Sequence, residues 1–144
     1  MVKISRILVG VDGSDNADRA FEYAGYLAKQ CEAERLFIIN VIEGFARNID
    51  TWRKRDSIVK ELEQNSRELL EKYKSRALSQ AFTTPEIISA AGSAGEEILR
   101  LADKEKMDTI VMGRRGLSTA SELLLGSVSH NLIHNAKCPV VTVI

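Results

Sequence analysis

Short runs rich in valine and isoleucine alternate along this chain with longer segments in which apolar residues recur every three or four positions. Continuous apolar runs are typical of strands buried on both faces, and helical crossovers are what parallel strands need as connections. The pattern therefore predicts an α/β fold, an open five-stranded parallel sheet with helices on both faces in three layers. The expected strands are 4–11, 36–41, 86–90, 108–113 and 139–144.

The expected helices have their own boundary signals. Ser14 or Asp15 is a suitable N-cap for the first, which carries the apolar stripe Ala17, Phe21, Ala24 and Ala28. A long second helix is predicted over 51–78, with a third opened by a capping box of Ser93 and Glu96. The last helix is expected from Ser127 to Ala136. Because no linker or repeat interrupts this series, we expect a single domain over 1–144.

Composition narrows the classes of partner. The 144 residues include 20 Lys and Arg against 20 Asp and Glu, so no overall charge draws the chain to nucleic acid or to an anionic membrane. No apolar run approaches the roughly 18 residues that cross a bilayer. Cys31 and Cys138 stand alone, without metal or disulfide spacing, and are expected to be reduced and structural. These features predict a cytoplasmic location.

Two loops are the candidate binding elements. In an open parallel sheet, ligands bind beyond the carboxyl ends of the strands, where the strand order reverses. The loop after the first expected strand begins Val11-Asp12-Gly13-Ser14, and the loop after the fourth begins Met112-Gly113-Arg114-Arg115-Gly116. Both place glycine and polar groups directly after a buried strand.

The second loop has the character of an anion site. It holds Gly113, Gly116 and Gly126, whose missing side chains let main-chain N–H groups approach a phosphate. It leads into the start of a helix, where free N–H groups and a partial positive charge favour anions. The Ser127 hydroxyl lies at that start, and Arg114 or Arg115 can add a charge-assisted contact.

A plainer interpretation is that Gly113 and Gly116 only end a strand and that Ser127 only caps a helix. The spacing of the glycines argues against it. The chain has neither a Gly-x-x-x-x-Gly-Lys-Ser/Thr loop nor a Gly-x-Gly-x-x-Gly fingerprint that would account for the cluster.

The spacing instead resembles that of the universal stress protein family, and within it the branch that binds ATP. The family's mark is Gly-x-x-Gly, nine residues, then Gly-Ser or Gly-Thr, which here is Gly113 to Gly116 followed by Gly126-Ser127. The resemblance covers the whole chain, from Ile7-Leu8-Val9-Gly10-Val11-Asp12-Gly13-Ser14 through 108–113 to Cys138-Pro139-Val140-Val141-Thr142-Val143.

This resemblance implies a Rossmann-like fold and a set of binding residues. Asp12 and the neighbouring backbone would meet the adenine and ribose side, and Val41 would touch the adenine. The nucleotide-binding residues so implied are Val11, Asp12, Gly13, Val41, Met112, Gly113, Arg115, Gly116, Gly126, Ser127 and Val128. The resemblance also implies a homodimer through the C-terminal strand, whose apolar residues 140–144 carry no charge that would discourage edge pairing.

A bound triphosphate needs a divalent cation, so Mg²⁺ or Mn²⁺ is expected with ATP, and Asp12 is the candidate protein ligand. Arg115 could face the transition-state charge of hydrolysis, but no residue is a convincing base, so any ATPase activity should be slow. The first hypothesis is therefore a nucleotide-dependent regulatory module of the stress response. The alternatives are an ATP-dependent hydrolase or transferase, using Ser121 or Glu122, and a structural member with an empty pocket.

Three other features receive simpler interpretations. His130 and His134 have a metal-ligand spacing, but Asn131 follows His130 where a zinc protease has glutamate, so surface or dimer-facing roles are favoured over a metal site. The basic run at 52–55 is followed by acidic residues and is interpreted as a solvated helix start. Glu97 is expected to point away from Glu96, which rules out a catalytic pair.

Overall fold

Five parallel strands form one sheet in the order β3-β2-β1-β4-β5. The computed structural model describes residues 2–43, 52–114 and 126–144, with side chains from Ser57 onward in the second range. The strands are β1 (Arg6–Gly10), β2 (Arg35–Ile42), β3 (Pro85–Ala91), β4 (Thr109–Gly113) and β5 (Val140–Val143).

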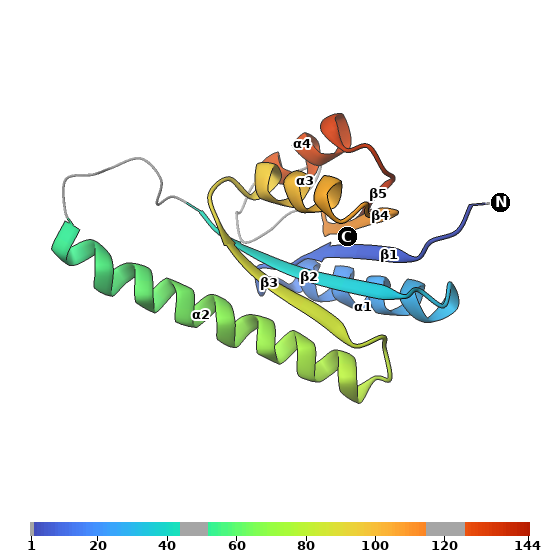
Figure 1. Ribbon diagram of the computed structural model, residues 1–144, viewed down its shortest axis with the longest axis horizontal. Coiled ribbons are helices and arrows are strands. Elements are labelled where there is room, and N and C mark those ends of the chain that lie inside the picture. The colour runs from blue at the N-terminus through green and yellow to red at the C-terminus, as the bar shows by residue number, and fades with distance from the viewer. Residues whose placement is uncertain (1, 44–51, 115–125) are drawn as a thin grey trace.

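Four helices cover the two faces of this sheet. α1 (Asp15–Gln30) and α2 (Trp52–Ser79) lie on one face, and α3 (Ala94–Lys104) and α4 (Ser127–Asn135) lie on the other (Figure 1). The predicted three-layer α/β fold is thus confirmed, and each predicted strand ends within two residues of the observed one. α2 runs beneath β3 and extends well beyond the end of the sheet (Figure 1).

Each face of the sheet has its own apolar core. Ile7 and Val9 pack with α1 and α2, where Phe21 and Tyr73 contribute rings 5.0 Å apart. Leu8, between them in sequence, packs against α3 and α4 on the opposite face. All three β1 residues are fully buried, which explains why this strand is apolar without alternation.

A polar cluster joins α1 to α2 above the first core. The Tyr73 hydroxyl donates to Asp18 Oδ1 at 2.6 Å, and Arg76 contacts both Asp18 (3.2 Å) and Glu22 (2.7 Å). Burial of the ring, together with the hydrogen bond to Asp18, raises the pKa of Tyr73 well above its ordinary value. The guanidinium of Arg76 also lies over the Phe21 ring, 4.8 Å from its centroid.

The predicted capping box at the third helix is wrong. Ser93 is the N-cap of α3, but its side chain makes no capping hydrogen bond. The Ala94 N–H instead donates to Glu43 Oε1 at 3.1 Å. β2 ends at Ile42 beside the start of α3. The Glu43 carboxylate can therefore accept from the Ala94 amide, although the two residues are 51 positions apart in the sequence.

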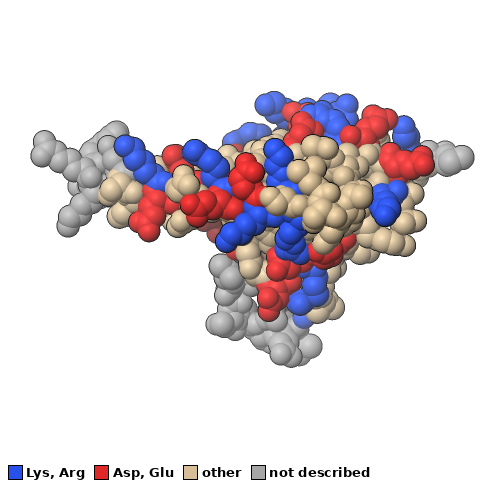
Figure 2. Space-filling view, turned by 90° about the horizontal axis from the view of Figure 1, so that it is seen from below, with Lys and Arg blue, Asp and Glu red and all other residues tan. Residues whose placement is uncertain are grey.

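The outer surface carries charges of both signs. On the side formed by α1 and α2, Lys and Arg alternate with Asp and Glu, and no large patch of one sign is visible (Figure 2). Both cysteines are free thiols, and burial raises the pKa of the Cys138 thiol. No helix in the described ranges is long and apolar enough to span a bilayer.

Candidate functional site

A cavity of about 370 Å³ opens at the carboxyl ends of β1 and β4. Successive strands proceed from β1 through β2 to β3 on one side, and the chain then returns to place β4 on the other side of β1. This reversal separates the two loops and leaves a crevice between them, as it does in other open parallel sheets. The volume lies within the range of roughly 300–1,000 Å³ found for small-molecule sites.

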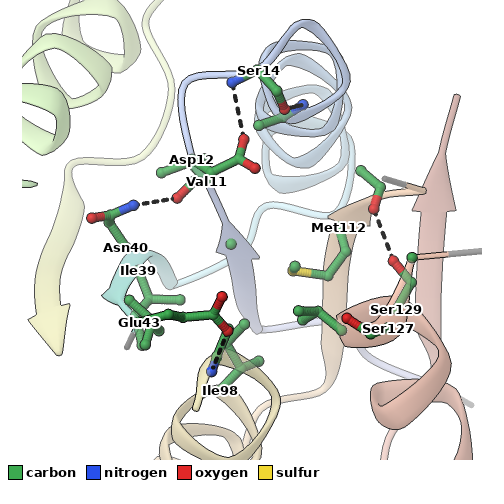
Figure 3. A pocket seen from close by; sticks show the side chains of 17 residues that line it. Val11, Asp12, Ser14, Ile39, Asn40, Glu43, Ile98, Met112, Ser127 and Ser129 are labelled. Carbon is green, nitrogen blue, oxygen red and sulfur yellow. Dashed lines mark hydrogen bonds between the residues drawn. The ribbon is translucent and has the colours of Figure 1, made fainter. Parts of the chain in front are cut away.

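The β1–α1 loop forms one polar wall. Asp12 Oδ1 accepts a hydrogen bond from the Ser14 N–H at 2.9 Å, and Ser14 Oγ in turn caps α1 by accepting from Ala17 N at 3.1 Å. Gly13 between them has a φ of +83°, a conformation that residues with a side chain adopt only at a cost. The loop is therefore fixed by its own hydrogen bonds, with the Asp12 carboxyl at the cavity (Figure 3).

The opposite wall is apolar. It consists of Ile39 and Val41 from β2, Ile98 from α3 and Met112 from β4. Ile39, Ile98 and Met112 face the same space in Figure 3, with the Glu43 carboxyl beside them at the start of α3. A flat apolar group of the size of a nucleobase suits such a wall, because the contact removes apolar surface of both the ligand and the wall from water.

The start of α4 closes a third side. Gly126 is the N-cap residue, so the Ser127 and Val128 amides belong to the first helical turn, which has no acceptors of its own helix. Ser127 is exposed and does not cap the helix, contrary to the plainer interpretation of its role. The free N–H groups and the positive end of the helix dipole at the start of α4 are suited to binding an anion.

Two contacts hold this helix start against the end of β4. Gly126 N donates to Arg114 O at 2.9 Å, and the buried Ser129 hydroxyl donates to Gly113 O at 2.9 Å. Both ends of the predicted phosphate loop are thus fixed beside each other at the cavity. Ser129 carried no signal in the sequence, since nothing in the motif distinguishes it from other helical serines.

Asn40 lines the cavity and forms a further, part-buried hydrogen-bond network there. Its Nδ2 donates to Val11 O at 2.7 Å, and its Oδ1 accepts from Ser66 Oγ at 2.7 Å. Ser66 Oγ also lies 2.7 Å from Ser89 Oγ, so α2, β2 and β3 share one set of hydrogen bonds. The sequence offered one signal for this residue, because Asn40 is the single polar side chain in the run Leu36 to Ile42.

Most of the predicted site residues meet in this cavity. Those that line it are Val11, Asp12, Val41, Met112, Gly113, Gly126, Ser127 and Val128. Gly13 does not line it and serves the turn instead. Arg115 and Gly116 lie outside the described residues, as do Ser121 and Glu122. Several further residues line the cavity without having been predicted from the sequence, among them Ile39, Asn40, Glu43, Ile98 and Ser129.

Few side chains in the described ranges are placed to hold a metal ion. Within the described ranges, no three His, Cys, Asp or Glu side chains gather as a metal site. His130 and His134 stack edge to face, 4.7 Å between centroids, on the exposed side of α4. Among the described residues, Asp12 and Glu43 are the carboxylates that line the cavity. Mg²⁺ at nucleotide phosphates uses one or two carboxylates, with phosphate oxygens and water as the other ligands.

Comparison with known proteins places the chain. A model of the universal stress protein family matches residues 3–143, nearly the whole sequence. The chain belongs to the universal stress protein family. The universal stress protein YxiE of Bacillus subtilis is similar to it, with 34% identity over 149 aligned positions that cover 96% of this chain and 98% of YxiE.

Two solved universal stress proteins share the fold. UspA from Lactobacillus plantarum has a TM-score of 0.91 over the full length of both chains, at 20% identity, and supports the fold alone. A universal stress protein solved in complex with cAMP has 30% identity and a TM-score of 0.76, covering 99% of each chain. The confirmed fold and the family membership agree with the resemblance seen in the motifs.

Proposed function

We propose that this universal stress protein binds ATP, with Mg²⁺ or Mn²⁺, in the cavity between the β1–α1 loop and the start of α4. In this proposal the adenine lies against the apolar wall near Val41, and the phosphates reach the first-turn amides of α4. The protein would act as a regulatory module of the stress response, whose nucleotide occupancy selects its conformation or partners.

The observation that carries the proposal is the composition of the three walls. An apolar wall, a carboxylate loop and a helix N-terminus converge on one cavity at the point where the strand order reverses. These walls match the three parts of a nucleotide, which are a flat base, a hydroxylated sugar and a charged phosphate tail. The related universal stress protein solved with cAMP supports the choice of an adenine nucleotide.

Asp12 is the proposed protein ligand of the cation. Its Oδ1 is engaged by the Ser14 N–H, which orients the carboxyl at the cavity without neutralising it. The cation would supply charge neutralisation to the phosphates, while the α4 amides hold their oxygens. The proposed roles of Arg115 and Gly116 concern residues outside the described ranges.

The test is direct. Protein purified without added nucleotide is denatured, and released nucleotides are identified by mass spectrometry, while titration calorimetry measures ATP binding with and without Mg²⁺. We expect retained adenine nucleotide and binding that weakens in Gly113→Val and Gly126→Val. Protein that releases no nucleotide and shows no heat with ATP and Mg²⁺ would refute the proposal.

The same preparations separate the regulatory module from the alternative, an ATP-dependent hydrolase or transferase that uses Ser121 or Glu122. A module retains ATP for hours, whereas an enzyme releases phosphate within seconds after Mg²⁺ is added. The free thiols Cys31 and Cys138 are compatible with the proposed cytoplasmic site of action.

A further inference from the structure

The hydrogen bonding between β1 and β2 changes at its last step, beside the cavity. Val11 N donates to Ile39 O at 2.9 Å, which continues the parallel ladder one residue past the end of β1. In a regular parallel ladder the next bond would run from Val41 N to Val11 O. Val11 O instead accepts from the side chain of Asn40 at 2.7 Å, and in the described ranges no hydrogen bond joins it to Val41 N.

Because the Asn40 side chain takes the place of the Val41 N–H at Val11 O, the main chain of Val41 is left free beside the cavity, which Val41 lines. The N–H and C=O groups of successive strand residues point to opposite edges, and Ile39 O points to β1. Val41, two residues on, points its N–H and C=O to the same side, where β1 has ended and the chain turns away at Gly13. Ile42 points to the other side, since its carbonyl accepts from Gly92 N at 3.0 Å.

The Asn40 side chain is itself oriented by a hydrogen bond from α2. Ser66 Oγ, in a residue only 4% exposed, donates to Asn40 Oδ1 and thereby fixes which end of the amide faces Val11. Ser89 Oγ lies 2.7 Å from the same serine oxygen. Such a network fixes an amide rotamer more firmly than one contact would.

We infer that Asn40 is a positioning residue for base recognition: by occupying Val11 O, its amide keeps the N–H and C=O of Val41 available to the edge of a bound nucleobase. This inference rests on the proposed nucleotide site. A donor beside an acceptor matches adenine, which carries an acceptor ring nitrogen beside its amino group. Guanine has the opposite order along this edge, so Asn40 acts on the preference for adenine over guanine.

The test compares wild type with Asn40→Ala, in which Val11 O is free to accept from Val41 N–H. Calorimetry gives Kd for ATP and for GTP, each with Mg²⁺. We expect wild type to favour ATP at least tenfold and Asn40→Ala to lose about tenfold of that ratio, the size of one net hydrogen bond. Ser66→Ala, which lies outside the cavity, should lower the ratio by less.

A second measurement does not need nucleotide. Hydrogen exchange of the Val41 amide, followed by NMR in the free protein, should be at least tenfold slower in Asn40→Ala than in wild type, because the amide gains an acceptor. Asn135→Ala is the matched control. Within the described part of the chain, the Asn135 side chain bonds to Asn131 of the same helix and to no other residue. The base preference of this variant and the exchange of its Val41 amide should therefore equal those of wild type.

The outcomes separate the two claims. Wild type that binds ATP while Asn40→Ala keeps the same ATP to GTP ratio overturns the inference and leaves the proposed function standing. Slow exchange of Val41 already in wild type likewise overturns the inference. Wild type that binds neither nucleotide overturns both. A lower melting temperature of the variants with an unchanged ratio shows a structural role only and also contradicts the inference.

Discussion

Gly113 at the end of β4 lies directly against Asn16 in the first turn of α1. A β-carbon at position 113 would stand 2.9 Å from the main-chain carbonyl carbon and from the β-carbon of Asn16. Gly113 directly precedes one of the two loops that border the cavity and Asn16 directly follows the start of the helix after the other, so this close contact sets the distance between the two loops.

The first prediction concerns that contact. Gly113→Ala should push α1 away from β4 and lower the free energy of unfolding by about 1–3 kcal/mol, the usual cost of overpacking. Urea denaturation measures this loss, and ATP titration should show weaker binding. Adding Asn16→Gly removes one of the two close carbons, so the double variant should lose less than the sum of the single losses. Strict additivity would show that Asn16 does not limit position 113.

The second prediction tests which residue caps α3. Because Glu43 accepts from Ala94 N whereas the Ser93 side chain makes no such bond, Glu43→Ala should cost about 0.5–1 kcal/mol of unfolding free energy. Ser93→Ala is the matched control and should change stability by less than half as much. Chemical denaturation of the two variants decides. The reverse order of effects would restore the local cap that the sequence suggested.

The third prediction concerns Tyr73 at alkaline pH. Its raised pKa means that only the unfolded chain loses the phenolic proton as the pH rises above about 10. The contribution of this group is therefore fully present below that pH and is lost as the pH rises towards the folded pKa. The stability of wild type should decline more steeply between about pH 10 and 11.5 than that of Tyr73→Phe.

At neutral pH, Tyr73→Phe should cost about 1 kcal/mol through loss of the hydrogen bond to Asp18. Tyr26→Phe, at a residue 59% exposed, is the control and should leave stability unchanged. All other ionisable groups are common to wild type and variant, so the difference between their pH profiles isolates Tyr73. Parallel profiles would contradict the prediction.

The fourth prediction concerns the proposed homodimer. β5 is a terminal strand of the described sheet, and Val143 O accepts from Arg114 N, so alternate residues such as Thr142 point their N–H groups to the open edge. Thr142→Pro removes one outward donor without removing a bond to β4. We expect wild type to sediment as a dimer at micromolar concentration and Thr142→Pro to shift towards monomer. Monomeric wild type would refute the dimer itself.

Local patterns in the sequence determined the fold because its elements carry their own signals. The buried run Ile7 to Val9 is typical of a strand covered on both faces, and the stripe from Ala17 to Ala28 is typical of a helix packed on one side. The glycine spacing from Gly113 to Gly126 likewise indicated the candidate binding loop, since glycine positions can be read from residue types alone.

Tertiary structure decided the contacts between residues distant in sequence. Nothing near Ser93 indicates that Glu43 would cap α3, and nothing near Asn40 indicates that Ser66 and Val11 would complete its hydrogen bonds. Such partners depend on strand order and on which element ends beside which, and these are set by packing of the whole sheet. The sequence alone thus located the end of the cavity that we propose for the phosphates, whereas only the folded chain revealed how the end proposed for the base is built.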